Sequence, residues 1–450
     1  MKLNLDQLIK WQYILNSYGP RLTGTDSHNR FIRFLQTEVS KLGYPIKRAP
    51  FNFNRTTIDN SQLTMTSNHT PIQLSGPVPY SGITGPEGIT APLKFCHKII
   101  TDKVRGKIAV INVRNLTIPS WPLMQQIDSF PQHKHKPGLL RHPLVSSTLI
   151  INTILKAKNK GAKGVLLIWH NISEELAVNE ILPFTNDYLG IPAVWVHEKQ
   201  QPLLEKTCHA NKTVTLTING HAKEEVTTES FSTMIKGTES KNQTIIINTH
   251  TDGPNAIEDN GPIALLTMLK YIKDQKMNFR HTFIFCFVSG HFQISQAGIH
   301  GGQATSRWLK DSRQYWDGHS THGKAVLGIT VEHLGVDSYT DNPRQNRLIY
   351  QNMSDSMYVY VSNQRNLSIL NEAMKVTQPL GNYYMLKCLK TAYFGEGQPL
   401  FQNGIPTISF ICMPLTLCQL ASFRNEPNIR LMFNQINLIM QLLTLSDRRL

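Results

Sequence analysis

Side chains that can bind a metal ion follow three consecutive apolar runs in the second half of the chain, residues 244–247, 282–288 and 325–331. Each run has the length and composition of a buried strand. In an open parallel sheet, ligands bind at the carboxyl ends of the strands, so side chains that follow different strands are expected to converge there. These side chains are His250 and Asp252 after the first run, His291 after the second, Glu332 and His333 after the third, and Glu258 and Asp259 just before the first crossover helix.

A convergent set of imidazoles and carboxylates is typical of a catalytic zinc site, which keeps one coordination position open for water. A carboxylate that bridges two ions about 3.5 to 4 Å apart can hold a shared water and clamp a reacting carbonyl. We predict that Asp259 is this bridge. Taken singly, a histidine after a strand or a glutamate near a helix more often has a structural role. The position of all of them after strands favours a metal site.

The elements that must position these residues are strands alternating with helices, which predicts an α/β fold with a doubly wound, mostly parallel sheet. A fourth strand is expected at residues 406–411. Apolar residues at helical spacing predict two helices at the start of the chain, a crossover helix that begins near Pro262, and a closing helix. Their buried faces are Leu8, Trp11 and Leu15; Ile32, Leu35, Val39 and Leu42; Leu265, Met268, Leu269 and Ile272; and Ile429, Met432, Ile436, Ile439 and Leu443.

The middle of the chain has a different pattern, in which Pro and Gly punctuate a stretch that begins near Leu74 and short apolar runs surround a single helix. The runs are residues 107–113, 164–169 and 191–196, and they predict a small α/β module. We therefore predict three segments: residues 1–72 as the first part of the main domain, 73–225 as the inserted module, and 226–450 as the main catalytic domain.

Composition excludes several classes of protein. The 46 basic and 31 acidic side chains give a net charge of +15, but no nucleic-acid-binding motif accompanies this charge, so we expect a basic surface and no nucleic-acid partner. No apolar run approaches the length of about 18 residues that a membrane span needs, which predicts a soluble protein. The first residues do not resemble a signal peptide. The six cysteines lack the close spacing of a structural zinc site and leave the compartment open.

Several motifs resemble those of the twenty-eighth metallopeptidase family, a group of zinc aminopeptidases that also includes glutamate carboxypeptidase and the transferrin receptor. The segment YGPRLTGTDSHNRFI is similar to the opening Gly-x-Arg-x-x-Gly element of the family, and THTDGPNAIEDNGPIALL is similar to its first metal motif. The segments VRGKIAVINV, KAKNKGAKGVLLIW and IPAVWV resemble an inserted protease-associated domain. The resemblance implies a peptidase fold, and protein contacts or substrate access through the inserted domain.

The resemblance also implies roles for individual residues. His250 corresponds to the first metal ligand, Asp252 to the carboxylate that orients it, Asp259 to the bridging ligand and Glu332 to a later ligand. The family's adjacent catalytic base and ligand correspond to Gly290 and His291, and its last histidine ligand has no counterpart. One zinc ion is therefore expected, or two if His291, His333 or Cys418 completes a second site. Glu258 and Glu396 are the candidates for the missing base, and the metal set is His250, Asp259, His291 and Glu332.

These residues predict a zinc-dependent metallopeptidase, similar to aminopeptidases, that cleaves peptide or related amide bonds with metal-activated water. Two alternatives stay open. The first is a binding or receptor-like protein that has kept the fold after losing catalysis, as Gly290 and the absent histidine suggest. The second is a single-zinc acyl-transfer enzyme, because glutaminyl cyclases resemble the same fold. Substrate, compartment and oligomeric state are not determined by the sequence.

Overall fold

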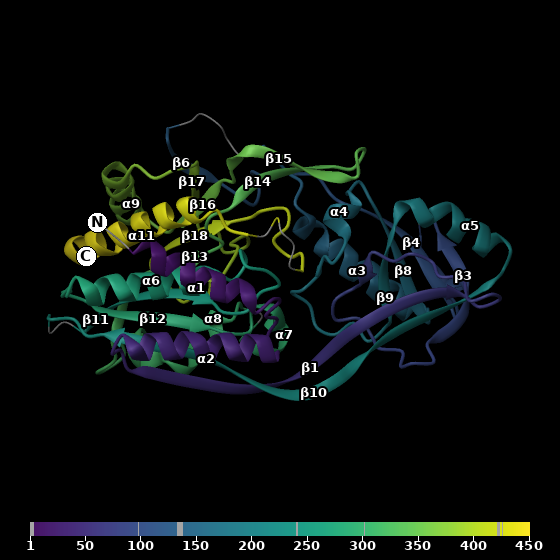
Figure 1. Ribbon diagram of the computed structural model, residues 1–450, viewed down its shortest axis with the longest axis horizontal. Helices are drawn as coiled ribbons and strands as arrows, with labels where there is room; N and C mark the ends of the chain where they lie inside the picture. Colours follow the sequence, from purple (N-terminus) through teal and green to yellow (C-terminus); the bar gives the residue numbers. More distant parts are fainter. Residues whose placement is uncertain are drawn as a thin grey trace.

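The computed structural model describes residues 4–97, 99–132, 138–239, 242–300, 302–420, 424 and 426–450. The molecule has two lobes, joined by a long antiparallel ribbon of β1 (Ile46–Met65) and β10 (Thr213–Ile235) that runs between them (Figure 1). The sequence analysis did not anticipate this ribbon. Its pairing extends from Ile46 opposite Thr233 to Met65 opposite Val214, so a single ribbon belongs to both lobes.

The larger lobe contains the sheet that positions the candidate site. Its four central strands are β12 (Thr282–Val288), β11 (Gln243–His250), β13 (Lys324–Glu332) and β18 (Thr407–Cys412), and each is parallel to its neighbour. They lie where the sequence predicted strands. Strand β10 flanks β12 antiparallel, and β16 (Met357–Val361), β17 (Tyr383–Lys387) and β6 (Gln126–Phe130) extend the other edge. The predicted α/β fold with a mostly parallel sheet is therefore confirmed.

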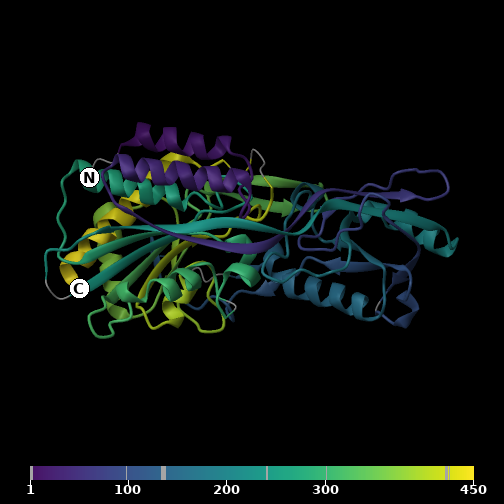
Figure 2. The same cartoon turned by 90° about the horizontal axis from the view of Figure 1, so that it is seen from below.

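Helices cover both faces of this sheet, as Figure 2 shows. Because side chains alternate along a strand, Ile245 and Ile247 of β11 face one layer and Ile246 faces the other. The first layer is formed by α1 (Leu5–Ser17), α2 (Asp26–Lys41), α6 (Gly261–Asp274), α9 (Gln364–Thr377) and α11 (Ile429–Arg449). The second layer includes α8 (Thr305–Asp311) and α10 (Gln398–Gln402), which contribute Trp308 and Leu400 to the core.

The smaller lobe is built from the middle of the chain, where the sequence predicted a small α/β module. Its strands are β3 (Ile89–Cys96), β4 (Ile108–Arg114), β8 (Gly164–His170) and β9 (Ala193–His197), all parallel, with β2 (Gly76–Pro77) at the edge. Helices α3 (Ser147–Asn159) and α5 (Gln201–His209) pack against them. The predicted boundary between residues 225 and 226 falls inside β10, so the three-segment division stays a prediction.

The remaining elements are short. Strand pairs β5 (Ile118–Pro119) with β7 (Leu139–Leu140) and β14 (Asp337–Asn342) with β15 (Arg347–Ser354) form separate two-stranded sheets. Helices α4 (Glu174–Ala177) and α7 (Ile294–Ala297) are single turns. Among the described residues, no helix combines the length and the apolar character that crossing a bilayer requires.

Candidate metal centre

The side chains that follow the parallel strands converge at the carboxyl edge of the sheet, as the sequence predicted. His250 is the last residue of β11, and Glu332 is the last residue of its neighbour β13, with His333 directly after it. His291 begins a short 3-10 helix, and two residues separate it from the end of β12. All four side chains are buried, with at most 5% of each residue exposed.

Glu258 lies in the middle of this group and faces each of the three histidines. Its Oε1 lies 3.6 Å from His291 Nε2 and 3.6 Å from His333 Nε2, and its Oε2 lies 3.7 Å from His250 Nδ1. On the far side of His250, the Nε2 atom is 3.6 Å from Glu332 Oε1. We call His250, Glu258, His291, Glu332 and His333 the His–Glu cluster.

The spacing of these atoms suits a bound metal ion better than direct hydrogen bonding. A hydrogen bond between nitrogen and oxygen is normally 2.7 to 3.2 Å long, whereas two ligand atoms about 2.0 to 2.1 Å from a tetrahedral zinc lie about 3.3 Å from each other. Ligand atoms of His250, Glu258 and His291 all lie within 4.8 Å of one another. The separations near 3.6 Å are therefore close to those of ligands that share an ion.

Four buried atoms of the cluster have no hydrogen-bond partner among the described residues: His250 Nε2, His333 Nε2, Glu258 Oε2 and Glu332 Oε2. An unpaired buried polar atom costs about 1 to 3 kcal/mol, so several of them at one place need a physical explanation. Four at one place indicate that the chain folds around a group that satisfies them.

Each histidine of the cluster is fixed through its Nδ1 atom. His250 Nδ1 lies 2.9 Å from the Asp252 carbonyl oxygen, and His333 Nδ1 lies 2.7 Å from the Cys412 carbonyl oxygen. His291 Nδ1 lies 2.7 Å from Glu396 Oε1. A carbonyl can only accept, so these contacts require the proton on Nδ1 of His250 and His333 and leave Nε2 as the lone-pair nitrogen. That is the tautomer a metal ion needs from an Nε2 ligand.

Burial sets the charge of the cluster. It lowers the pKa of His250 to about 4, with neighbouring His291 acting in the same direction, and it lowers the pKa of His333 well below its ordinary value. Both rings are thus neutral near pH 7. Burial also raises the pKa of Glu258 well above its ordinary value, with Asp259 and Asp252 adding to the effect, and raises the pKa of Glu332 to about 8. A nearby cation would reverse the shifts of both carboxyls.

Asp252 supports the cluster by a route that differs from the prediction. His250 is held by the main-chain carbonyl of Asp252, while the carboxylate accepts hydrogen bonds from the main-chain N–H groups of Gly290 and Phe292 and from the Thr23 hydroxyl. Burial raises the pKa of Asp252, but His28, His250 and His291 outweigh it, and the net pKa lies below the ordinary value. The carboxylate therefore joins the loop after β12 to the loop after β11.

Asp259, the predicted bridging ligand, is turned away from the cluster. Its two oxygens accept hydrogen bonds from Arg21, with Nε at 2.7 Å from Oδ2 and Nη2 at 2.6 Å from Oδ1, and both side chains are buried. The geometry places Glu258, one residue earlier, among the histidines instead. Both residues carry a carboxylate, so the sequence alone cannot show which of the two lies in the site. The path of the backbone decides this.

Glu396, one of the two predicted bases, has both of its oxygens occupied. Oε1 accepts from His291 Nδ1 and from the Ala304 N–H at 3.1 Å, and Oε2 accepts from the Thr305 N–H at 2.7 Å. Burial raises the pKa of Glu396, but these hydrogen bonds and the nearby histidines bring it below the ordinary value. Glu396 thus fixes the orientation of His291 and remains ionised.

Position 290, where the sequence lacks the expected base, has no room for a side chain. Gly290 has φ of +116°, a conformation that residues with a Cβ rarely adopt. A Cβ on Gly290 would lie 2.4 Å from the Cβ of Ala297. Glycine is therefore required here by both backbone and packing, and the local fold has adapted to the absence of a carboxylate.

Residues from both lobes cover the cluster. Phe184 of the smaller lobe lies with its ring centroid 5.6 Å from that of His291 and packs on Phe292. Cys418, considered as a substitute ligand, is buried beside Phe184 and Phe292 in an apolar group, and burial raises the pKa of its thiol well above the ordinary value. A neutral thiol in apolar surroundings fits a packing role better than a ligand role.

Arg21 is the residue that the sequence analysis left without a role. It lies in the quoted PRLTG segment, and besides Asp259 it donates to the main-chain carbonyls of Leu15, Gly19 and Asn255. A single buried arginine thus ties the first helix to the segment that carries Glu258. The position of Arg21 between Gly19 and Gly24, in the segment that resembles a Gly-x-Arg-x-x-Gly element, is the signal in the sequence that could have indicated this contact.

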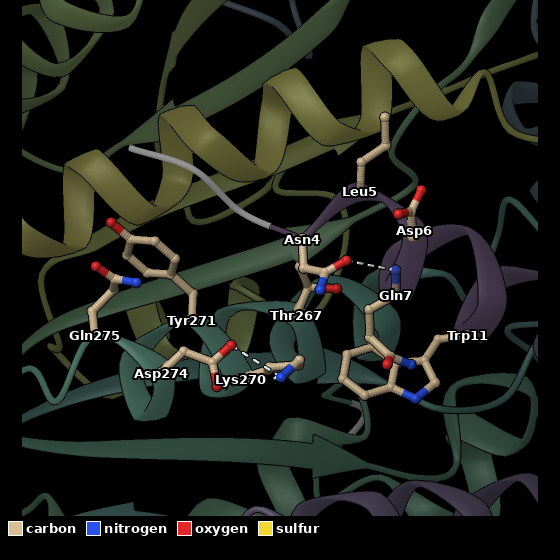
Figure 3. A pocket seen from close by; sticks show the side chains of 10 residues that line it. All are labelled: Asn4, Leu5, Asp6, Gln7, Trp11, Thr267, Lys270, Tyr271, Asp274 and Gln275. Atoms are coloured by element: carbon tan, nitrogen blue, oxygen red, sulfur yellow. Dashed lines mark hydrogen bonds and ion pairs between the residues drawn. The ribbon is translucent and has the colours of Figure 1, made fainter.

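Two pockets formed by described residues have linings that contain no residue of the His–Glu cluster. One of about 430 Å³ lies in the outer helical layer between α1 and α6, where Figure 3 shows Asn4 bonded to Gln7 and Lys270 paired with Asp274. None of its lining residues belongs to the candidate site. A second pocket, of about 340 Å³, lies beside the site and is lined by Thr23 and Phe292 among others.

No protein-family model and no curated protein sequence matches this chain. Solved structures do. A zinc aminopeptidase from Bacillus subtilis is similar with a TM-score of 0.70 and 15% identity, over 99% of this chain and 96% of that one. An aminopeptidase from Aneurinibacillus sp. strain AM-1 has a TM-score of 0.63 and 14% identity, over 98% and 93%. A peptidase M28 precursor from Shewanella amazonensis has a TM-score of 0.62 and 15% identity, over 98% and 95%. The chain thus has the fold of these aminopeptidases along nearly its whole length.

Proposed function

We propose that this protein is a zinc-dependent hydrolase of peptide or related amide bonds, of the aminopeptidase type. The observation that carries the proposal is the set of four unpartnered ligand atoms in the His–Glu cluster, at the edge of the sheet where α/β proteins bind ligands. The fold that it shares with the zinc aminopeptidase of Bacillus subtilis supports the choice of metal and of reaction.

The donor set fits zinc, because neutral imidazoles and carboxylates are its usual nitrogen and oxygen ligands. His250 and Glu332 face each other across 3.6 Å and would hold one ion. His291 and His333 both face Oε1 of Glu258 and would hold a second, so Glu258 takes the place between the two that the sequence assigned to Asp259. When bound, zinc supplies a Lewis acid that polarises an amide carbonyl and activates water.

Glu258 is the better of the two base candidates, because both oxygens of Glu396 already accept hydrogen bonds. A base and a ligand are distinguished by the variant Glu258→Gln. If Glu258 is the base, turnover falls by roughly 10² to 10⁴ while metal content is unchanged. If Glu258 is a ligand, metal content falls with turnover. Glu396→Gln is expected to lower turnover less than Glu258→Gln in either case.

The test of the proposal is the metal content of the purified protein by mass spectrometry, for wild type beside His250→Ala. His69→Ala is the control, because His69 is an exposed histidine in a turn. We expect one or two zinc equivalents in wild type and in the control, and a loss in His250→Ala. Turnover of aminoacyl 4-nitroanilides should follow the metal content. Absence of zinc after zinc is supplied would reject the hydrolase.

Gly290 favours a second candidate, a binding protein that has kept the metal fold without the reaction. No side chain fits at position 290, where the expected base would stand. The two carboxylates of the His–Glu cluster, Glu258 and Glu332, already contact other residues of the site. This candidate predicts zinc binding with no hydrolysis of any aminoacyl or peptide substrate. Under either candidate, we retain the proposal that the smaller lobe is a protease-associated domain that contacts protein or controls access.

A further inference from the structure

The pocket of about 340 Å³ beside the metal centre has an unusual lining. Most of its wall is apolar, with Leu22, Ile58, Ile181 and Leu420 among the lining residues. It lies between the lobes, because Ile58 belongs to the ribbon strand β1, Ile181 to the smaller lobe, and Phe292 to the loop that carries His291. Ligand sites are commonly apolar hollows of this size in which a few polar groups fix the orientation of the ligand.

The described lining contains three charged residues, Arg55, Asp59 and Glu180. Asp59 is exposed, and its Oδ2 lies 3.7 Å from His221 Nε2, whereas Glu180 is 3% exposed. Neither of its carboxylate oxygens has a hydrogen-bond partner among the described residues. Its main chain is fixed, because residue 180 forms a β-bridge with Gln419 and the next residue donates its N–H to the Cys418 carbonyl. The backbone is therefore satisfied on both sides while the carboxylate is left unpaired at the wall of a cavity.

Arg55, from β1, is the basic residue of the described lining. Its Nε and Nη1 atoms are buried and have no hydrogen-bond partner in the described part of the chain. No ion pair within 4.0 Å joins Arg55 to Glu180 among the described residues, although both line the same pocket. Arg55 is partly buried, with two unpartnered nitrogens, and Glu180 is a buried carboxylate without a partner among the described residues. Together they are complementary to a ligand that carries one charge of each sign.

We propose that this pocket binds a free α-amino acid with an aliphatic side chain, whose ammonium group pairs with Glu180 and whose carboxylate pairs with Arg55. The apolar wall receives the side chain. The proposal does not rest on hydrolysis at the metal centre, because the pocket contains none of the residues of the His–Glu cluster. Burial raises the pKa of Glu180 well above its ordinary value, and a bound ammonium group would supply the missing charge.

The pocket is also coupled to the metal centre through two of its lining residues. The hydroxyl of Thr23 donates to Asp252, and the N–H of Phe292 donates to the same carboxylate at 3.0 Å. A ligand in the pocket therefore touches residues that position the loop of His291. If the centre hydrolyses peptides, an amino acid bound here lies beside the place of its release.

The test is isothermal titration calorimetry of the full chain with three probes that share an isobutyl group and differ in their charged groups. L-leucine carries both charges, L-leucinamide carries only the ammonium, and 4-methylpentanoate carries only the carboxylate. Wild type is expected to bind L-leucine at least 10-fold more tightly than either of the others. Glu180→Gln should weaken L-leucine and L-leucinamide at least 10-fold, and Arg55→Gln should weaken L-leucine and 4-methylpentanoate while leaving L-leucinamide unchanged.

Matched controls are Glu87→Gln and Arg114→Gln, which make the same chemical changes at exposed positions. The titrations are repeated after dialysis against EDTA, so that binding at a metal ion is separated from binding in the pocket. Retention of Glu180-dependent binding in the stripped protein supports the proposal even if no hydrolysis is found. The proposal is overturned if wild type binds no leucine at millimolar concentration, or if the Glu180 and Glu87 variants bind it equally. Circular dichroism on every variant excludes unfolding as the cause.

Discussion

The carboxylates around the metal centre fall into two groups that differ in how they are satisfied. Asp252, Asp259 and Glu396 each accept hydrogen bonds on both oxygens, from main-chain N–H groups, from Arg21 or from His291. Glu258 and Glu332, equally buried, each keep an oxygen without a donor among the described residues. Folding accounts for the first group, because its members join separate segments of chain. The second group has no such partner in the described part of the chain, and this is the difference that the proposed metal ion would explain.

The largest effect is expected from the first group. Arg21→Met leaves Asp259 charged and unpaired in the interior, which should lower the free energy of unfolding by about 3 to 5 kcal/mol. The control is Arg449→Met, because Arg449 pairs with Glu372 at an exposed position, and a loss of about 0 to 1 kcal/mol is expected there. Urea denaturation measures both. Equal losses in the two variants would show that Asp259 does not depend on Arg21.

Gly290→Ala tests whether the loop that donates to Asp252 has room for a side chain. Backbone strain and the contact with Ala297 should together lower the free energy of unfolding by about 2 to 4 kcal/mol. Gly19→Ala is the control, since Gly19 also has a positive φ but nothing lies within 4 Å of the added Cβ, so about 1 to 2 kcal/mol is expected. A stable Gly290→Glu variant with raised turnover would contradict this interpretation of the site.

The two groups should respond oppositely to neutral substitutions in metal-free protein. Asp252→Asn replaces an acceptor with a donor opposite two N–H groups and should cost about 1 to 3 kcal/mol of stability. Glu258→Gln removes a buried carboxyl that no cation compensates, so stability should be unchanged or higher. Denaturation in the presence of EDTA gives both values. A loss in Glu258→Gln as large as that in Asp252→Asn would remove the distinction between the groups.

The smallest effect is expected at Glu396, which contacts His291 and would act on the proposed metal ion through it. Glu396→Gln keeps the shape of the side chain but removes the charge that fixes the ring, so metal affinity should fall roughly 10- to 100-fold. Competition with a zinc chelator measures the affinity, and Glu87→Gln serves as the exposed control. If affinity is unchanged while stability falls, Glu396 only anchors helix α8.

The sequence predicted the strands of the main sheet closely. The apolar run at residues 282–288 coincides with β12, and the runs at 244–247 and 325–331 lie inside β11 and β13. These strands are buried on both faces, and a continuous apolar run is the pattern that such burial requires. The ribbon of β1 and β10 was missed for the opposite reason. Much of it is exposed between the lobes, and its mixed polar sequence carries no such run.

By itself, the sequence determined the fold class and the edge of the sheet at which the candidate metal-binding side chains lie. The reason is that the burial and the order of the strands can be predicted from local patterns of apolar residues. The sequence also identified His250, His291 and Glu332 as members of that edge. Only the tertiary structure decided between Glu258 and Asp259, because Arg21 arrives from a segment more than two hundred residues away and pairs with one of them. The same is true of the pocket with Glu180 and Arg55, because these residues come from segments far apart in the sequence and line one pocket only in the folded structure.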